Sequence, residues 1–186
     1  MPRLPEFDEA NFDARQKTIY DEIIAARGHL GGPFKIWLYS PELADRNQRL
    51  GAFLRYHTSL EPRLSELAIL VVGRHFDCQV EWTLHEQFAR EAGLEDEVID
   101  ALRNRQKPVD LGAAESAVYA YATELLNGGK VGDATFAAAH LELGDPAVVE
   151  LTSLVGHYVH VSMTLNAFQV ALPPDIKPTL TDAPVH

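Results

Sequence analysis

Three side chains with catalytic chemistry stand at helical spacing in the run "HFDCQVEWTLHEQ", which begins at His75. Cys78, Glu81 and His85 occupy positions i, i+3 and i+7 and therefore share one face of a helix. A hydrogen bond between Glu81 and His85 would raise the basicity of the imidazole and fix its orientation. Cys78 falls in the first turn, where free N–H groups and the helix dipole favour a thiolate. The pattern indicates acid–base or thiol chemistry, with an ordinary surface acid–histidine pair beside a buried thiol as the alternative.

A further carboxylate, Glu66, precedes an almost wholly apolar stretch from Leu67 to Val72, and a helix that is apolar all round is a buried one. A carboxylate in such a place needs a partner or acquires a raised pKa. An acid with a raised pKa suits proton transfer near neutral pH. The alternative is an exposed position beside Arg63 or Arg74. We expect Glu66 to meet the acid–histidine pair of the following helix in a shielded hollow, where the three groups transfer protons.

The C-terminal part of the chain adds "GHYVHVSMTLNAF", in which His157 and His160 share a helix face next to Tyr158. Two histidines on an apolar helix are as typical of satisfied core groups as of functional groups. They also complete a candidate ligand set for a metal in the core of a helix bundle: Glu66, Glu81, His85, His157 and His160. Glu81 and His85 are four residues apart, however, whereas di-iron bundles use Glu-x-x-His, so the sequence predicts no metal.

The composition argues against several classes of protein. A chain of 186 residues with 46% hydrophobic residues can build one packed domain, and disorder is not expected. A net charge of -11 argues against a nucleic-acid partner. The single cysteine cannot form an internal disulfide bond, which fits a reducing compartment. The N-terminus shows no apolar signal core, and no run approaches the roughly 18 apolar residues of a membrane span, so we expect a cytoplasmic protein without a membrane partner.

Helix signals dominate, and no strand-like alternation, glycine-rich phosphate loop or repeat stands out. Ser40, Pro41 and Glu42 stand in the order typical of a helix start, and two prolines at 173 and 174 stop the last helix. The stretch "HLGGPFKIWLYS" at 29–40 is interpreted as an apolar loop that lines a core or pocket edge. Helices are predicted at about 12–27, 41–56, from 62, 77–93, 95–103, 113–126, 133–141 and 145–170, followed by an irregular or partner-clasping tail. The predicted class is all-α, in a single domain spanning 1–186.

The segment "PRLSELAILVVGRHFDCQVEWTLHEQFAREAGLEDEVIDAL" resembles the core of the carboxymuconolactone decarboxylase family, which includes the alkyl hydroperoxidase D proteins. The "RLSELAIL" helix, the "CQVEWTLH" helix start and the "AREAGL" exit before a short acidic helix match together. The stretches "GPFKIWLYSPELADRNQRLGAFLRYHTSL" and "LVGHYVHVSMTLNAFQVALP" extend the resemblance over about 32–173, the expected core of the domain. The resemblance implies an alkyl hydroperoxidase D-like helical bundle that assembles into dimers, trimers or hexamers.

The redox branch of this family has an upstream Glu, a Cys-x-x-Cys pair and a His four residues after the second Cys. Aligned on that motif, Glu66, Cys78 and His85 take the places of the Glu, the first Cys and the His. Glu81 replaces the second Cys, which in the redox branch attacks peroxide while the first Cys resolves the product as a disulfide. Because the chain has no second thiol, a two-cysteine peroxidase cycle is not available within one subunit.

The decarboxylase branch acts without a cofactor on a muconolactone that carries a carboxylate. By resemblance, Glu81 and His85 would be the acid–base pair of such a reaction and Glu66 would tune His85. The sequence has no obvious arginine clamp for the carboxylate, and Arg74 and Arg55 are candidates only because they are nearby in the sequence.

The sequence thus leaves three functions open. The first, which we expect, is a cofactor-independent acid–base enzyme, a lyase or isomerase, acting on a small organic acid or lactone. The second is a thiol peroxidase with antioxidant, peroxiredoxin-type activity that uses Cys78 and an external thiol. The third is a non-catalytic or metal-binding helical oligomer. The predicted catalytic residues are Glu66, Glu81, His85 and Cys78, and the predicted substrate-binding residues are Trp82, Trp37, Tyr158 and His157.

Overall fold

The helices of the computed structural model confirm the all-α class. The structure describes residues 3–5 and 7–183, and these contain no strand. A short 3-10 helix, η1 (Glu9–Asn11), precedes the α-helices. In chain order these are α1 (Ala14–Arg27), α2 (Phe34–Trp37), α3 (Pro41–Tyr56), α4 (Pro62–His75), α5 (Gln79–Glu91), α6 (Asp96–Arg103), α7 (Ala113–Gly128), α8 (Asp133–Leu143) and α9 (Asp145–Phe168).

The local sequence explains where several helices begin and end. The Asp13 side chain accepts a hydrogen bond from the backbone N–H of Gln16, whose own side chain completes a capping box at the start of α1. Gly28 ends α1 in the left-handed conformation, with φ 77°. Prolines stand in the first turns of α3, α4 and α9, where a missing N–H costs nothing. Ser40 is the N-cap residue of α3, as predicted, although its side chain makes no capping hydrogen bond.

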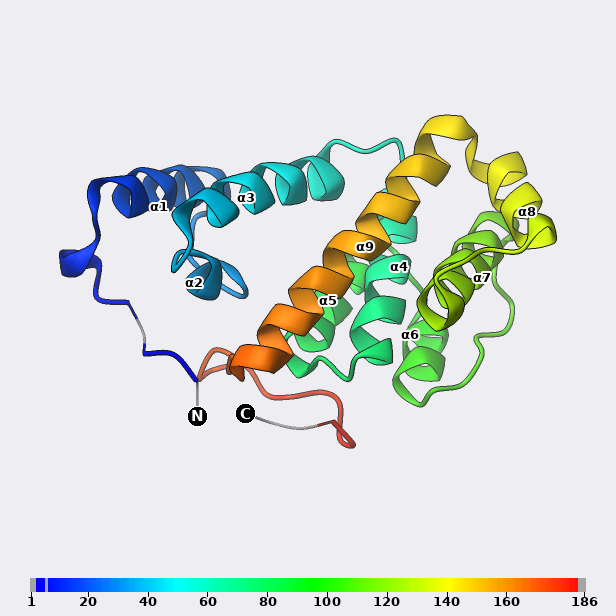
Figure 1. The fold of residues 1–186 in the computed structure, drawn as a ribbon. Helices are drawn as coiled ribbons and strands as arrows, with labels where there is room; N and C mark the ends of the chain where they lie inside the picture. Colours follow the sequence, from blue (N-terminus) through cyan, green and yellow to red (C-terminus); the bar gives the residue numbers. More distant parts are fainter. Residues whose placement is uncertain (1–2, 6, 184–186) are drawn as a thin grey trace.

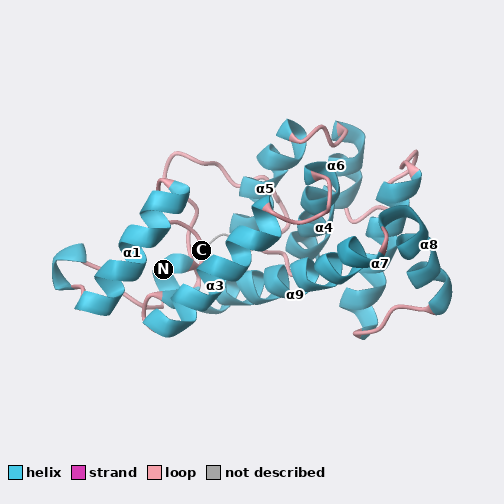
Figure 2. Cartoon of the chain, turned by 90° about the horizontal axis from the view of Figure 1, so that it is seen from above, coloured by secondary structure: helices cyan, strands magenta, loops and turns pink. Residues whose placement is uncertain are grey.

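Helix α4 is the central element of the fold. It packs against α5, α7 and α9, and the long α9 crosses the middle of the molecule in Figure 1. Helices α1 and α3 lie side by side at one end and α7 and α8 at the other, as Figure 2 shows from above. All residues of α4 from 64 to 74 are buried, which confirms the prediction of a buried helix and places the Glu66 carboxylate inside it.

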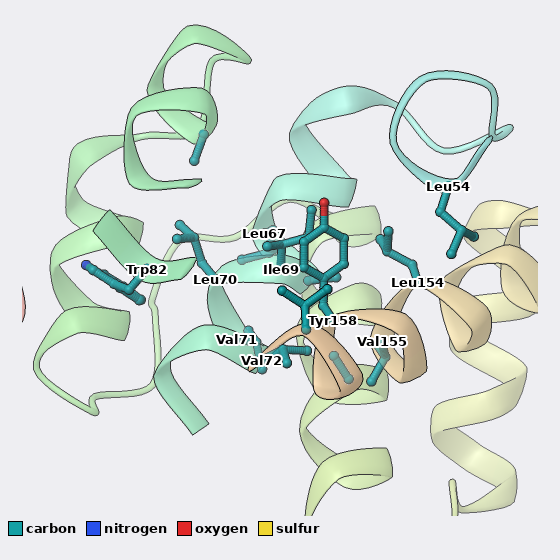
Figure 3. Packing of buried hydrophobic residues seen from close by; sticks show 14 of the residues in the cluster. Leu54, Leu67, Ile69, Leu70, Val71, Val72, Trp82, Leu154, Val155 and Tyr158 are labelled. Atoms are coloured by element: carbon teal, nitrogen blue, oxygen red, sulfur yellow. The ribbon is translucent and has the colours of Figure 1, made fainter. Parts of the chain in front are cut away.

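Aliphatic side chains of α4 and α9 fill the core around Tyr158 (Figure 3). Leu67, Leu70 and Leu154 are completely buried there. Burial of one such side chain contributes roughly 2 kcal/mol to the free energy of unfolding. In Figure 3 the hydroxyl oxygen of Tyr158 points away from Val155, so the polar end of the tyrosine leaves this aliphatic cluster.

A tight connection sets α5 against α4. Asp77 adopts a left-handed conformation with φ 48°, and the N–H of Cys78 donates to the carbonyl oxygen of Gly73 at 2.9 Å. A Cβ atom on Gly73 would lie 3.4 Å from the backbone nitrogen of Trp82, so the glycine allows the two helices to approach closely. The connection turns the first two turns of α5 toward Glu66.

Two segments refine the predicted organisation. The expected loop at 29–40 contains the short helix α2, whose Phe34 and Trp37 are buried, because four residues are too few to show a periodic pattern. The tail after α9 is irregular, as predicted, and packs on its own chain. Leu180 is buried, and Oδ2 of Asp182 accepts a hydrogen bond from Nη2 of Arg74 at 2.6 Å. The last predicted tail residues, 184–186, lie outside the described part of the chain.

Within the ranges that the structure describes, none of the helices combines the length and the apolar character that crossing a membrane requires.

Candidate active site

Two carboxylates from neighbouring helices hold one buried imidazole. Nδ1 of His85 donates a hydrogen bond to Oε2 of Glu66 at 2.6 Å. Nε2 of the same ring lies 2.8 Å from Oε1 of Glu81, which precedes His85 by one turn of α5. Glu66 is 7% exposed and the other two residues are 5% exposed. The structure therefore brings together the three residues that the sequence predicted to meet, and we call Glu66, His85 and Glu81 the Glu–His–Glu cluster.

The Glu–His–Glu cluster keeps its imidazole charged. A lone pair on either ring nitrogen would repel the carboxylate oxygen that it faces, so both nitrogens carry protons. Burial alone lowers the pKa of His85, but the charges of Glu66 and Glu81 and their hydrogen bonds outweigh burial and raise it to about 9. An imidazolium between two carboxylates can act as a proton donor near neutral pH.

Aromatic rings shield this imidazolium. Tyr158 of α9 meets it edge-on with ring centroids 5.1 Å apart, and Phe88, one turn further along α5, does so at 5.5 Å. The guanidinium group of Arg55 lies 4.2 Å from the centroid of the Phe88 ring. Phe88 is partly exposed and Tyr158 is buried, so the imidazolium contacts one ring that reaches the surface and one that lies in the core.

Cys78 lies where a thiolate is disfavoured, contrary to the expectation from the sequence. It occupies the N-cap position of α5 and is completely buried. Burial raises the pKa of the thiol to about 12, with a further contribution from the charge of Glu81, and the hydrogen bonds from the start of α5 offset this only in part. Desolvation therefore outweighs the helix N-terminus, and Cys78 is a neutral thiol at physiological pH.

Trp82 belongs to the core and not to the cluster. Its ring is completely buried, and Nε1 donates to Oε2 of Glu86 at 2.9 Å. One residue corresponds to about 100° around a helix, so Trp82 faces a different direction from Glu81. The structure thus does not bring Trp82 together with the acid–base residues.

Two further predicted residues, Trp37 and His157, gather with His160 in a second group, which we call the His157 group. Trp37 stacks on His160 with ring centroids 5.0 Å apart and an angle of 3° between the planes, and its Nε1 donates to Oγ1 of Thr164 at 3.2 Å. Burial lowers the pKa of His157 to about 4, assisted by the charges of His160 and Arg27. His157 is therefore neutral at physiological pH.

Tyr158 connects the two groups. Its ring contacts His85 on one side and His157 on the other, at centroid distances of 5.1 and 5.5 Å. Burial, followed by the charge of Glu81, raises the pKa of Tyr158, so the phenol keeps its proton. Its hydroxyl group makes no hydrogen bond within the described chain, and it remains available as a donor.

The structure separates the arginines near the site. Arg74 is held by Asp77 and Asp182, whereas Arg55 lies against Phe88, which contacts His85. Sequence reasoning missed Arg27, the last residue of α1, because its position depends on how α1 packs. It also missed Phe88, although the spacing of three residues from His85 on one helix was a usable signal.

The five candidate metal ligands fall into two groups. His85 shares its nitrogens with Glu66 and Glu81, while His157 and His160 lie with Trp37. In the part of the chain that the structure describes, no set of three or more His, Cys, Asp or Glu side chains is arranged to hold a metal ion.

The fold and the site define an all-α protein built around a buried acid–histidine cluster, and comparison with known proteins supports the resemblance found in the sequence. Residues 41–124 match the family model of the carboxymuconolactone decarboxylase family. The matched segment contains the whole Glu–His–Glu cluster and Cys78. No match was found among the curated proteins.

Solved structures with the same fold include a protein of unknown function from Agrobacterium tumefaciens, a candidate antioxidant defence protein AhpD. It is 19% identical, with a TM-score of 0.67 over 78% of this chain and 100% of that one. The debrominase Bmp8 is 12% identical, with a TM-score of 0.72 over 91% of each chain. Its cysteine-to-alanine variant in complex with 2,3,4-tribromopyrrole is 11% identical, with a TM-score of 0.72 over 91% of this chain and 90% of that one. At these identities the likeness concerns the fold.

Proposed function

We propose that this protein is a cofactor-independent acid–base enzyme, of lyase or isomerase type, that acts on a small organic acid or lactone. The observation that carries the proposal is the buried imidazolium of His85 between two carboxylates. Charged groups buried in this way are costly to the fold, and shifted pKa values of this kind are concentrated at catalytic sites. The match of residues 41–124 to the model of a family named for a decarboxylase supports the same class of chemistry.

Glu81 is the group that exchanges a proton with the substrate. Its Oε1 faces His85, while Oε2 has no hydrogen-bond partner in the described chain. In the acid direction, the Nε2 proton of His85 moves to Glu81, and the resulting carboxylic acid protonates a substrate carbon. That carbon holds the electron pair left when its bond to a departing CO₂ or to a proton breaks. In the base direction Glu81 takes the proton and His85 keeps its own.

Glu66 is a positioning residue in this scheme. It accepts the Nδ1–H hydrogen bond at 2.6 Å and so fixes which ring edge faces Glu81. It acts on the reaction through His85, as a carboxylate behind an imidazole does in other proton-transfer sites.

The thiol-peroxidase alternative depends on Cys78, and the position of Cys78 weighs against it. A completely buried thiol with a pKa of about 12 has little thiolate to attack a peroxide. The cycle would also need a second thiol from another molecule, because the chain has one cysteine.

The proposal includes a small-molecule substrate, a homo-oligomer and a cytoplasmic location. A small substrate suits the shielded cluster, and Bmp8, which shares the fold, has been crystallised with a small ring compound. A dimer, trimer or hexamer is supported by a stripe of exposed apolar residues at helical spacing along α3: Leu43, Leu50, Phe53 and Tyr56. A reducing location is supported by the unpaired Cys78. The single domain spanning 1–186 stays a prediction.

Proton exchange tests the proposal before the natural substrate is known. A panel of small keto acids, hydroxy acids and lactones is incubated with the protein in D₂O, and replacement of C–H by C–D, or conversion, is followed by NMR. We expect the wild type to accelerate proton exchange or conversion of at least one compound. Glu81→Gln should lower that rate about 100-fold or more, and Cys78→Ser should leave it unchanged. A rate that survives Glu81→Gln, or that is lost only in Cys78→Ser, would contradict the proposal.

A further inference from the structure

Two arginines beside the Glu–His–Glu cluster have no acidic partner. Arg27 ends α1 and Arg55 lies in the last turn of α3, and within the described chain neither forms an ion pair or a hydrogen bond. Nε of Arg27 is fully buried and has no acceptor. In the same part of the chain, every other arginine pairs with a carboxylate or a backbone carbonyl group. In a chain of net charge -11, two unpaired arginines close together point to an anion that is supplied from outside.

Aromatic rings hold both guanidinium groups in place. The Arg27 guanidinium lies 4.7 Å from the centroid of Phe34, and that of Arg55 lies 4.2 Å from Phe88 and 5.5 Å from Tyr56. A ring attracts the cation without accepting its N–H groups as a carboxylate would. Each arginine is therefore fixed while its hydrogen-bond donors stay available.

Ring contacts bring both arginines near Tyr158. Tyr158 contacts His85 and His157, Arg55 lies against Phe88, which also contacts His85, and Arg27 lies beside His157 at Gly51. Burial and the charges of Glu81 and Glu66 raise the pKa of Tyr158, while the charges of Arg55 and Arg27 oppose them. The charge of Arg55 also acts on Arg27, whose pKa is lowered chiefly by burial.

Gly51 of α3 allows Arg27 to reach this place. A Cβ atom on Gly51 would lie 3.5 Å from Nη2 of Arg27 and 2.9 Å from Nε2 of His157. Because the glycine has no side chain, both nitrogen groups lie against the backbone of α3 at the same point. His157 is neutral there, so it adds a polar atom without adding a third positive charge.

We propose that Arg27 and Arg55, together with the Tyr158 hydroxyl group, bind the carboxylate group of the substrate. Guanidinium groups bind carboxylates through paired N–H···O bonds, and such an anion would provide an acceptor for the buried Nε of Arg27. The inference rests on the proposed acid–base function and narrows its substrate class to small carboxylic acids or carboxylate-bearing lactones.

Benzoate binding tests this site without requiring turnover. Isothermal titration compares benzoate with benzamide, a neutral molecule of nearly the same shape, in the wild type, Arg27→Gln and Arg55→Gln. Arg46→Gln is the matched control, because Arg46 lies on α3 with Arg55 but is exposed and paired with Glu42. We expect benzoate to bind about tenfold or more tightly than benzamide, and each site variant to weaken benzoate about tenfold or more. Arg46→Gln should leave the affinity unchanged.

Thermal unfolding separates binding from a structural role. Because Nε of Arg27 is buried without an acceptor, Arg27→Gln should unfold at the same temperature as the wild type or higher. If a glutamine variant does not fold, the corresponding lysine variant replaces it and should retain part of the affinity. Absence of benzoate binding, or equal binding of benzoate by both site variants and the wild type, would overturn the inference. So would loss of benzoate binding together with dissociation of an oligomer, because the arginines would then serve a subunit contact.

Glu81→Gln distinguishes this inference from the proposed function. The variant should still bind benzoate through the arginines while it loses proton exchange. Arginine-dependent benzoate binding without Glu81-dependent exchange would refute the proposed function alone. Glu81-dependent exchange in a protein whose arginine variants bind benzoate normally would refute this inference alone.

Discussion

His85 is buried, His157 is half-buried and both contact Tyr158, yet their surroundings leave one charged and the other neutral. His85 lies between two carboxylates, which raise its pKa to about 9 against the effect of burial. His157 lies near another histidine and Arg27, and burial lowers its pKa to about 4. The difference shows that carboxylate partners can outweigh burial, which without them leaves an imidazole neutral at physiological pH.

The two regions also come from different parts of the chain. The Glu–His–Glu cluster lies wholly within residues 41–124, the segment that matches the family model. The His157 group and Arg27 come from α1, α2 and α9, outside that segment. On the functions proposed above, the family segment supplies the proton transfer and Arg55, and the surrounding helices add Arg27 and Tyr158 to the recognition of the substrate's carboxylate.

The same substitution at both histidines should give the largest contrast. His85→Leu leaves Glu66 and Glu81 buried without their cation, and we expect it to lower the free energy of unfolding by about 3–5 kcal/mol at neutral pH. His157→Leu removes a neutral ring that has no carboxylate partner, and we expect a change below about 1.5 kcal/mol. Urea unfolding followed by circular dichroism measures both. An equal loss of unfolding free energy in the two variants would mean that the carboxylates beside His85 do not stabilise its charged ring.

The pH dependence of stability should reflect the two histidines in separate windows. The pKa of His85 is raised above its unfolded value, so its contribution is complete below about pH 6.5 and is lost as pH rises through about 9. The pKa of His157 is lowered, so the unfolded state binds more protons between about pH 4 and 6.5 and stability falls on acidification there.

Urea midpoints between pH 4 and 9.5 measure this dependence. We expect His85→Leu to remove the alkaline loss of stability that arises from Glu66 and Glu81. We expect His157→Leu to reduce the acid loss, which arises chiefly from burial of the ring and then from the charges of His160 and Arg27. If His85→Leu left the alkaline loss of stability unchanged and His157→Leu left the acid loss unchanged, the assigned charge states would be wrong.

Cys78 extends the comparison, because Glu81 raises its pKa as well as that of His85. A thiol pKa of about 12 instead of 9.0 leaves about a thousandfold less thiolate at neutral pH. Labelling with a disulfide reagent should therefore be slow in the folded protein and fast in urea. Glu81→Gln should speed the reaction of the folded protein modestly. Rapid labelling of the folded wild type would restore the thiol-peroxidase alternative.

The smallest expected effect concerns Arg27. Its charge contributes to the lowered pKa of His157, after burial and His160. Arg27→Gln should raise the pKa of His157 slightly toward its ordinary value and leave that of His85 unchanged. Histidine NMR titration measures both, with Arg46→Gln as the control. A larger shift at His85 than at His157 would place Arg27 on the wrong side of Tyr158.

Periodicity and spacing predicted most of the helices and the three residues of the Glu–His–Glu cluster, because one face of α5 and one buried turn of α4 are properties of local sequence. They did not predict the state of Cys78, since desolvation depends on everything that packs around the thiol. They also could not place Arg27, which lies far from the cluster in sequence and reaches Tyr158 through the packing of α1 on α3. They also could not show that the Trp82 ring is completely buried and bonded to Glu86, because that depends on how α5 packs.

The protonation state of His85 is the most direct test of the Glu–His–Glu cluster. Nitrogen-15 NMR of the wild-type imidazoles, assigned with His85→Leu, distinguishes nitrogens that carry protons from those that do not. We expect both nitrogens of His85 to be protonated at neutral pH and the ring to titrate near pH 9, while His157 stays neutral. If His85 were neutral at pH 7, with one unprotonated ring nitrogen and a pKa below 7, the cluster could not act as the proton donor described here.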